Sequence, residues 1–463
     1  MRTCLSRFVT SAICLSLVMA APFVCSVHAQ NPPAAACAPC IRADMEFLAS
    51  DAMRGRGSGT HDEQVAATFV GSELQRYGIA PAGDNGTYVQ TATIVSRSTA
   101  VPPVMTFSHN GGQTRWAHGD QIIVLGMPKE SVSGPLQKLK SFSDPIKPGS
   151  VVLAPAGANA QNMGGAPRAG AAMLLAPAPP QFEQRWSALG KRLPRLGSSA
   201  MGGNAMTLLN HDAATALSAL ADGTTITIMA QPGPEQRYQT WNALGILRGS
   251  DPEQSKQVVL LSAHLDHLGV GPAVNGDDIY NGADDDASGT TAVLEMARVL
   301  GSMVAPKRTV VFALFGSEEK GGLGSNYFLD HPAVPLQSIV ANLEFEMIGR
   351  ADAAVKPDEL WLTGWDRSNL GPALAQHGAK LVGDPHPAEN FFQRSDNIVL
   401  AKRGVVAQTV SSFGLHSQYH QPSDDLQHID WQHMEAAIGS MIAPVEWLVN
   451  SDFKPEWLPG KKP

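Results

Sequence analysis

The sequence predicts an α/β fold in which a mostly parallel central sheet is flanked by helices and a smaller β-rich domain is inserted. Beyond residue 236, short apolar runs alternate with segments of helical periodicity, which is typical of a parallel sheet covered on both faces. Between residues 125 and 235, apolar runs are instead separated by stretches rich in Gly, Ala and Pro. The chain has 463 residues, 43% of them hydrophobic, which is enough for about two or three domains.

Residues 1–29 have the features of a cleaved secretory signal. Two arginines precede an apolar run over residues 8–27, and a small-residue site ends at Ala29, before Gln30. We therefore expect cleavage at about Ala29/Gln30 and a periplasmic or secreted protein with no stable membrane association. The alternative is an uncleaved membrane anchor, but Ser, Thr and Pro interrupt the apolar run.

Only two cysteines, Cys37 and Cys40, follow the predicted signal. In an oxidising compartment this pair can close as a disulfide. A redox-active CxxC motif is the alternative, but the pair follows a Pro/Ala-rich linker and does not connect a strand to a helix. The formal net charge of -8 argues against nucleic acid and against anionic membrane surfaces as partners.

The first part of the catalytic domain is predicted at residues 30–124. It begins with a short helix and a glycine-rich turn. A second helix follows, in which apolar residues recur at helical spacing before Gly78: Val65, Ala66, Phe69, Val70 and Leu74. The inserted domain, residues 125–235, is predicted to contain strands in the runs "GSVVLAP" and "GAAMLLAP" and offers few candidate catalytic residues.

Residues 236–463 form the predicted catalytic core. The runs "QVVLLSA", "RTVVFALFG" and "SIVANLEFEMIG" are predicted strands, and "SGTTAVLEMARVLGSM" and "LGSNYFLDH" are predicted helices between them. In sheets of this kind, ligands bind where the strands end. The residues that directly follow each strand are therefore the candidate functional residues.

The first of these strands ends in "SAHLDHLG". His264 is a candidate metal ligand, and Asp266 is suited to accept the hydrogen of its other ring nitrogen and so to fix its tautomer. His267 is a competing ligand. A histidine in this position that has only a structural role is the alternative.

Three adjacent carboxylates, Asp284, Asp285 and Asp286, precede the next predicted helix in a stretch without Lys or Arg. They repel one another unless solvent or a cation separates their charges, and a helix dipole contributes only about 0.3–1 kcal/mol. A divalent cation would be sufficient, and a capping turn that precedes a helix is the alternative.

Further acidic and imidazole groups follow the later strands. Glu318 and Glu319 come directly after "TVVFALFG", and one of such a pair can bind metal while its neighbour acts as a base. The remaining candidates are Glu344 and Glu346 in "NLEFEMIGR", and His416 and His420 near Asp424 and Asp425. Histidines and carboxylates without cysteine ligands are typical of catalytic zinc, and a bridging carboxylate is typical of two metals roughly 3.5–4 Å apart.

The ordered motifs "AHLDHLG", "YNGADDDASG", "FGSEEKGGLGSNYF", "EMIGR", "RSDN" and "YHQPSDD" resemble the co-catalytic di-zinc aminopeptidase family, which includes relatives of bacterial leucyl aminopeptidases, glutamate carboxypeptidase and the transferrin receptor. The front segment "FLASDAMRGRGSGT…YVQ" also resembles this family, and the insert resembles its protease-associated domain. The resemblance covers most of the chain after the signal and is strongest after residue 257. It implies the zinc exopeptidase fold and peptide substrates.

The resemblance also implies two zinc ions per chain and a role for each motif residue. His264, Asp285 and Glu346 would hold one zinc, and Asp285, Glu319 and His420 the other, with Asp285 as the bridge. Glu318 would be the general base that takes a proton from a metal-bridging water and passes it to the leaving amine, and Asp266 would orient His264. Tyr419 is a candidate oxyanion helper.

Three positions depart from the family pattern, and at one of them Asp286 stands where asparagine is more frequent. Glu346 stands where aspartate is usual, with Glu344 as an alternative ligand, and Asn397 stands where histidine is frequent. The predicted function is an exported zinc-dependent exopeptidase, most simply an aminopeptidase. The alternatives are a carboxypeptidase or dipeptidase, for which Arg350 or Arg394 could hold a substrate carboxylate, a glutaminyl cyclase-like enzyme with one zinc, and an inactive binding relative.

Overall fold

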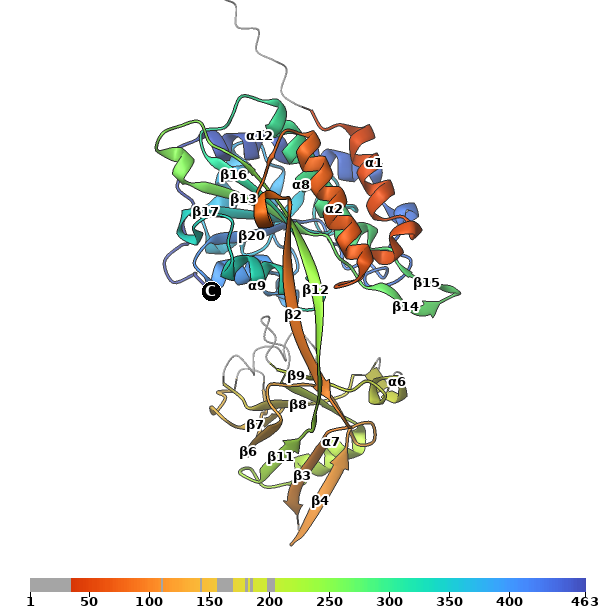
Figure 1. Cartoon of the computed structure of the whole chain (residues 1–463). Helices are drawn as coiled ribbons and strands as arrows, with labels where there is room; N and C mark the ends of the chain where they lie inside the picture. Colours follow the sequence, from red (N-terminus) through yellow and green to blue (C-terminus); the bar gives the residue numbers. More distant parts are fainter. Residues whose placement is uncertain are drawn as a thin grey trace, which may run out of the picture. The chain divides into compact units, whose positions relative to one another are not determined.

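Figure 1 shows the computed structural model of the chain, which describes residues 35–109, 111–141, 144–155, 170–179, 182–183, 186–197 and 205–463. The predicted signal, residues 1–29, lies outside these described residues. All described residues belong to one compact unit, Ala35–Pro463. None of the helices within the described ranges is both long enough and apolar enough to cross a membrane.

The described chain begins with two helices joined by a glycine-rich turn, as the sequence predicted. They are α1 (Ala38–Leu48) and α2 (His61–Arg76), and the short 3₁₀ segment η1 (Asp51–Arg56) lies between them. The apolar residues at helical spacing that are buried are Ile41, Met45 and Leu48 of α1 and Ala66, Val70 and Leu74 of α2, whereas Phe47 is exposed and Val65 and Phe69 are half-buried. Cys37 and Cys40 form the predicted disulfide at the start of α1.

A mostly parallel sheet forms the centre of the fold, which confirms the predicted fold class. Strand β13 (Val258–His264) lies between β16 (Thr309–Phe315) and β17 (Ile339–Phe345), and both pairings are parallel. Beyond β17, β20 (Val406–Ser411) is also parallel. The antiparallel strands β12 (Pro232–Leu247) and β18 (Leu360–Leu362) flank this parallel group.

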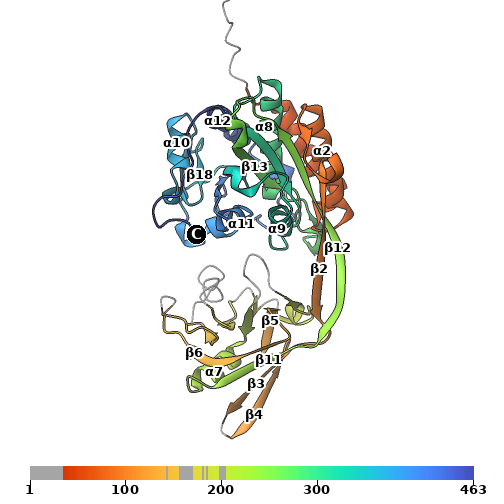
Figure 2. The same cartoon turned by 60° about the vertical axis from the view of Figure 1, so that its left-hand side comes forward.

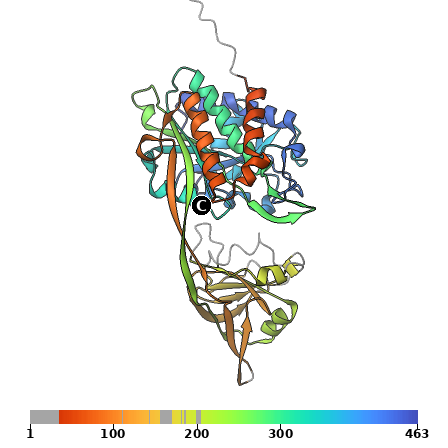
Figure 3. The ribbon, with the colours of Figure 1, turned by 45° about the vertical axis from the view of Figure 1, so that its right-hand side comes forward.

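Helices cover both faces of this sheet. Figure 3 shows α1, α2 and α8 (Gly289–Ser302) side by side on one face, and α12 (Trp431–Asn450) also packs against α8. Figure 2 shows α9 (Leu323–Asp330) and α11 (Asn397–Lys402) on the other face, where their apolar side chains share one core cluster with alternate residues of the strands. Strands buried on both faces explain why β13 and β16 are apolar at every position but the ends and Ser262.

A separate hydrophobic core lies between β2 (Val89–Thr99) and β12 in the sequence, and these two strands pair in a long antiparallel ladder. The elements that contribute to this core are β3 (Val104–His109), β5 (Ile122–Met127), β6 (Ser131–Lys138), β7 (Val151–Leu153), β8 (Met173–Pro177), β10 (Met206–Leu209), α7 (His211–Ala219) and β11 (Thr225–Met229). The predicted strands near residues 149–155 and 170–177 are β7 and β8. Because β3 packs in this core, the core begins before residue 125, and the domain boundaries at 124 and 235 stay predictions.

Gly289 begins α8 at a point where the backbone passes very close to its neighbours. A Cβ at this position would overlap the carbonyl oxygen of Phe345 and the carboxylate of Asp286. We expect Gly289→Ala to destabilise the chain by about 1–3 kcal/mol or more, because neither neighbour can move without disturbing β17 or the loop before α8. The midpoint of urea unfolding measures this loss. Gly439→Ala, where the new methyl group would meet only Ala36 at 3.7 Å, is the matched control and should not lower that midpoint.

Asp44 is a buried acid on α1, and its surroundings predict a pH effect on stability. Burial, together with the charges of Glu73 and Glu295, raises the pKa of Asp44 to about 7, although Arg76 opposes this shift. A carboxyl group with a raised pKa in the folded state favours folding most below its unfolded pKa, and this contribution is lost as the pH rises through about 7. We expect Asp44→Asn to stabilise the chain relative to wild type at pH 9 but not at pH 4, by on the order of 1–4 kcal/mol.

Urea unfolding of wild type and Asp44→Asn at both pH values measures this difference. The exposed Asp222, changed to Asn, serves as control and should follow wild type at each pH. An Asp44→Asn variant that loses as much stability as wild type between pH 4 and pH 9 would show that Asp44 does not cause the effect.

Candidate metal centre

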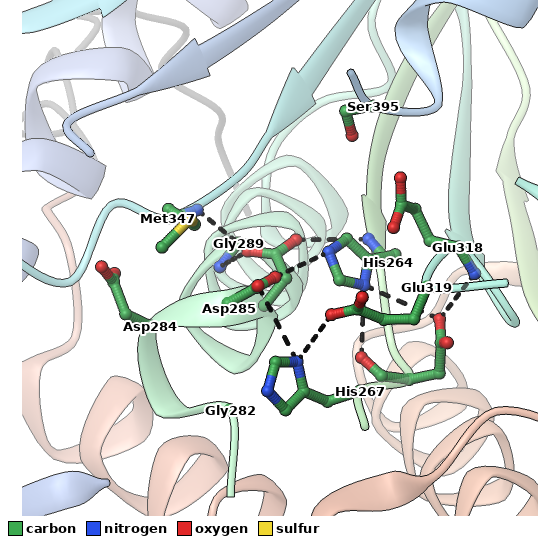
Figure 4. Close-up of polar contacts among 12 residues, drawn as sticks. His264, His267, Gly282, Asp284, Asp285, Gly289, Glu318, Glu319, Met347 and Ser395 are labelled. Carbon is green, nitrogen blue, oxygen red and sulfur yellow. Dashed lines mark hydrogen bonds and ion pairs between the residues drawn. The ribbon is translucent and has the colours of Figure 1, made fainter. Parts of the chain in front are cut away.

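The carboxyl ends of the central strands bring the candidate ligands together. His264 is the last residue of β13, Glu319 lies in the loop after β16, and Glu346 follows β17 directly. Asp285 lies in the segment Ala283–Ser288 that leads into α8. Figure 4 shows the His264 ring and the carboxylates of Asp285 and Glu319 directed toward one another.

Two groups of ligand atoms meet here, and Asp285 belongs to both. His264, Asp285 and Glu346 form the first group, in which His264 Nε2 lies 3.1 Å from Asp285 Oδ1. In the second, His420 Nε2 lies 3.2 Å from Asp285 Oδ2 and 3.3 Å from Glu319 Oε1. Ligand atoms around a tetrahedral zinc ion lie roughly 3.3 Å apart, since each is about 2.0–2.1 Å from the metal. The structure thus brings the five predicted ligands together, and the spacings of the His264 and His420 nitrogens from the carboxylates are close to those around a zinc ion.

Buried polar atoms without hydrogen bonds mark the same place. Among the described residues, His264 Nε2, both ring nitrogens of His267 and Glu319 Oε1 are buried and have no hydrogen-bond partner. Such atoms are costly unless something satisfies them, and here imidazole nitrogens and carboxylate oxygens face one another. Divalent cations would satisfy His264 Nε2, His267 Nδ1 and Glu319 Oε1, and the donor types are those of catalytic zinc.

The charges at the site are mutually dependent. Burial by itself raises the pKa of Asp285, but His264 and His420 hold it well below its usual range. Burial and Asp285 by themselves raise the pKa of Glu319, but His267 and His420 lower it to about 2. Burial lowers the pKa of His420, but the carboxylates of Asp285 and Glu319 outweigh it and raise the pKa to about 10. The carboxylates of Asp285 and Glu319 are therefore negatively charged.

The other two aspartates of the triplet, Asp284 and Asp286, accept hydrogen bonds from backbone N–H groups and do not belong to a ligand group. Asp284 accepts a hydrogen bond from Gly349 N at 2.7 Å and lies 2.9 Å from His416 Nε2. Asp286 accepts hydrogen bonds from the backbone N–H groups of His264, Gly289 and Met347. Burial raises the pKa of Asp286 well above its usual range. Only Asp285 is left to face the ligand groups, so three adjacent carboxylates have three different partners.

Arg56 ties the glycine-rich turn to both metal-binding loops. Its side chain is fully buried and donates hydrogen bonds to four carbonyl oxygens. These belong to Leu48, Leu265, Asn281 and Gly282. Leu265 directly follows His264, and Gly282 lies three residues before Asp285, so Arg56 fixes the backbone on each side of the site.

We expect Arg56→Met to lower the free energy of unfolding by at least roughly 3 kcal/mol, because it leaves four buried carbonyl groups without donors. Urea unfolding in the presence of zinc measures the loss. Arg403→Met, at an exposed arginine paired with Asp330, is the control and should change the unfolding free energy by less than about 1 kcal/mol. An Arg56→Met variant as stable as that control would contradict the role assigned to Arg56.

Glu318 and Asp266 are linked through the backbone. The Glu318 N–H donates to Asp266 Oδ1 at 2.9 Å, and Ser58 Oγ donates to Asp266 Oδ2 at 2.5 Å. The Asp266 carboxylate lies 3.7 Å from His264 Nδ1, too far for a hydrogen bond, and the nearer atom is the Asp266 main-chain oxygen at 3.2 Å. Asp266 therefore positions the predicted base directly and contacts His264 through its backbone. Burial raises the pKa of Glu318 well above its usual range.

The two carboxylates of β17 and its end have different surroundings. Glu344 accepts hydrogen bonds from Ser395 Oγ, Asn397 N and Thr409 Oγ1, so its oxygens are already occupied. Glu346 belongs to the first ligand group, and burial raises its pKa to about 8 in the absence of a cation. The geometry therefore places Glu346, not Glu344, at the site.

The candidate oxyanion helper lies next to the second ligand group. The Tyr419 ring stacks on the His420 ring, with centroids 3.8 Å apart. Tyr419 also lines a small pocket together with Glu346, Met347, Trp361, Phe391, Arg394 and Phe413. Glu346 of the first ligand group therefore faces this pocket.

Sequence reasoning did not identify Arg56 or the role of Asp424. Asp424 accepts hydrogen bonds from the backbone N–H groups of Asp284 and Asp285 and so holds the aspartate loop from the far side. Its position after His420 was the available signal. Arg56 had none, because its four partners are carbonyl groups, which any residue supplies.

Comparison with known proteins gives a consistent result. Residues 242–444 match the sequence model of Peptidase family M28. Aminopeptidase YwaD of Bacillus subtilis (strain 168) is 28% identical over 224 residues, which cover 46% of this chain and 46% of that protein, so this chain spans about half the length of that relative. Probable lipoprotein aminopeptidase LpqL of Mycobacterium tuberculosis (strain ATCC 25618 / H37Rv) is 26% identical over 422 residues, 81% of this chain and 77% of LpqL.

A solved structure shares the fold. The aminopeptidase from Aneurinibacillus sp. strain AM-1 superposes with a TM-score of 0.54 and 16% identity, over 92% of this chain and 96% of that chain.

Proposed function

Residues 242–444 form a Peptidase family M28 domain, and on this premise we propose that the chain is an exported zinc metallopeptidase, specifically an aminopeptidase that removes N-terminal residues from peptides. The observation that carries the proposal is Asp285, whose two oxygens belong to two ligand groups, beside the buried base Glu318. The names of the relatives YwaD and LpqL, both aminopeptidases, support the same activity.

In the proposed mechanism, the zinc ions supply Lewis acidity and lower the pKa of water, and side chains of the protein transfer the proton. Glu318 accepts a proton at its carboxylate from the attacking water and returns it to the nitrogen of the leaving amine. Asp266 holds the Glu318 backbone in position. A free α-amine of the substrate would be held by a bound metal ion or by a nearby acid such as Glu319.

The two candidate carboxylate clamps, Arg350 and Arg394, each have one acceptor within the protein. Arg350 Nη1 donates to Gln418 Oε1 at 3.0 Å, and Arg394 Nη1 lies 3.3 Å from Glu389 Oε2. Arg350 Nε and Nη2 have no hydrogen-bond partner among the described residues, so the arginines do not separate an aminopeptidase from a carboxypeptidase or dipeptidase, and the substrate test below does. A glutaminyl cyclase-like enzyme needs one zinc, whereas Asp285 serves two ligand groups, and an inactive relative would be expected to lack some of these residues.

The test uses the purified chain without residues 1–29, saturated with zinc. We expect it to hydrolyse aminoacyl-anilides and dipeptides that have a free α-amine, and not the same substrates after N-acetylation. Turnover only of N-blocked peptides with a free carboxylate would point to a carboxypeptidase, and cyclisation of N-terminal glutamine would point to a cyclase. No turnover with two zinc ions bound would overturn the proposed activity.

The predicted signal and insert extend this proposal. We place the protein in the periplasm or outside the cell, on the features of residues 1–29, and fractionation of cells with N-terminal sequencing of the product tests this. We further assign the strands between β2 and β12 to a protease-associated domain, on the resemblance of the sequence.

A further inference from the structure

His267 has a fixed position at the site, although the sequence-based prediction assigned it to neither of the two ligand groups. Its backbone N–H donates to Arg56 O at 3.1 Å, and its carbonyl oxygen accepts from Ser58 N at 3.2 Å. The side chain is fully buried. Gly282, with φ of +60°, packs against the ring so closely that a Cβ there would overlap it. The backbone and the ring of His267 are thus fixed from two sides by the glycine-rich turn and the aspartate loop.

The ring is directed into the second ligand group. His267 Nδ1 lies 2.9 Å from Glu319 Oε1 and 3.8 Å from Asp285 Oδ2, and the two dashed lines in Figure 4 mark these approaches. His267, Asp285 and Glu319 together form a group whose ligand atoms all lie within 4.8 Å of one another. The His267 and His420 rings meet edge to face across this group, with centroids 5.7 Å apart.

From this geometry we infer that His267 is a fourth protein ligand of the second zinc ion, which Asp285, Glu319, His420 and His267 hold together. This inference rests on the proposed function in so far as it assumes a pair of zinc ions. The first ion then has three protein ligands and the second has four. Four ligands complete a tetrahedral zinc site, whereas three leave a position open. The first ion is therefore the one with a position left for substrate or water.

The alternative is that His267 only positions Glu319 through a hydrogen bond. The contact between His267 Nδ1 and Glu319 Oε1 is short, but neither atom makes an aligned hydrogen bond to any described residue. The ring nitrogen points between the two carboxylates, as expected for a nitrogen that shares a cation with both. His267 Nε2 also has no hydrogen-bond partner among the described residues, so no second hydrogen bond fixes the tautomer that a positioning role through Nδ1 would need.

Zinc X-ray absorption of the full chain loaded with two zinc ions tests this inference directly. Imidazole ligands give a characteristic scattering pattern, so the average number of imidazoles per zinc can be measured. With His264, His267 and His420 as ligands, we expect an average of about 1.5 imidazoles per zinc. An average of about 1.0 would overturn the inference, since it leaves His267 outside the metal shell.

The variant His267→Ala gives a second, independent readout. We expect it to keep one tightly bound zinc, to bind the other at least about 100-fold more weakly in competition with a chromophoric chelator, and to average about 1.0 imidazole per zinc when both sites are filled. His433→Ala is the matched control. His433 is a buried histidine whose ring nitrogens contact Pro357 O and Ser412 Oγ, and its loss should lower stability but leave zinc affinity and the imidazole count unchanged.

Wild-type affinity for both ions in His267→Ala would refute the inference. If that variant does not fold, the imidazole count of the wild-type chain still decides the question. Failure of this inference can be distinguished from failure of the proposed function. A wild-type chain that averages about 1.5 imidazoles per zinc but cleaves no aminoacyl substrate would retain His267 as a ligand and reject the aminopeptidase.

Discussion

Replacing Glu318 with Gln is expected to lower kcat by roughly 10²–10⁴-fold while both zinc ions stay bound. Glu318 belongs to neither ligand group, so metal binding does not depend on it. Glutamine has nearly the same shape and keeps the backbone hydrogen bond to Asp266, but it cannot accept the proton. Hydrolysis of an aminoacyl-anilide, measured together with zinc content, separates loss of the base from loss of metal.

The exposed Glu253, changed to Gln, is the matched control for this prediction. Glu253 pairs only with Lys256 at the surface, so the change should leave kcat within about twofold of wild type. Full turnover by Glu318→Gln would remove Glu318 from the mechanism. Loss of zinc from Glu318→Gln would instead mean that Glu318 is a metal ligand and that the residues assigned to the two ligand groups are incomplete.

Asp285→Ala is expected to lose both zinc ions and all measurable activity. Asp285 is the one residue common to the two groups of potential ligands, with Oδ1 near His264 and Oδ2 near His420. Without Asp285, each ion loses a ligand, and the negative charge of the Asp285 carboxylate between the two ligand groups is lost. Zinc content after gel filtration, by atomic absorption, should fall from about two ions per chain to below about 0.2.

Two comparisons interpret this result. Glu346→Ala removes a ligand from the first group alone and should retain about one zinc ion. Asp366→Ala changes a surface aspartate that pairs with Lys461, and should retain two. If Asp285→Ala still bound both ions, Asp285 could not be the bridge. A far-UV circular dichroism spectrum like that of the wild type excludes a general failure to fold.

The fold was predictable where one local pattern determines the structure. β13 and β16 are apolar at nearly every position, and such a pattern in segments of seven residues indicates a strand buried on both faces. The predicted start of α8 at Ser288 agrees with the observed start at Gly289. The beginning of the insert was harder to predict. In β3 and β4 (Gly112–Ala117), inward and outward side chains alternate as in any antiparallel pair, and no local pattern shows which core these strands join.

The candidate site was predictable for residues at strand ends. His264 ends β13, Glu346 directly follows β17 and Glu319 lies in the loop after β16, so the sheet itself brings them together. His267 could not be ranked, because β13 ends at His264 and the alternation of side chains beyond that point no longer gives a direction. The pairing of Asp266 with the backbone of Glu318 was also inaccessible, since it depends on how the loops after β13 and β16 approach each other.

The hydrogen bonds of Arg56 restrict the order in which the chain can fold. Its partners Leu265, Asn281 and Gly282 lie 209, 225 and 226 residues further along the chain, so the first turn cannot reach its final state until all of these have been synthesised. Closing loops of this length makes assembly slow. During synthesis, the segment around Arg56 therefore cannot complete its hydrogen bonds until residue 282 has been added. In a chain cleaved between Arg56 and residue 282, the two fragments would have to associate before the zinc site could form.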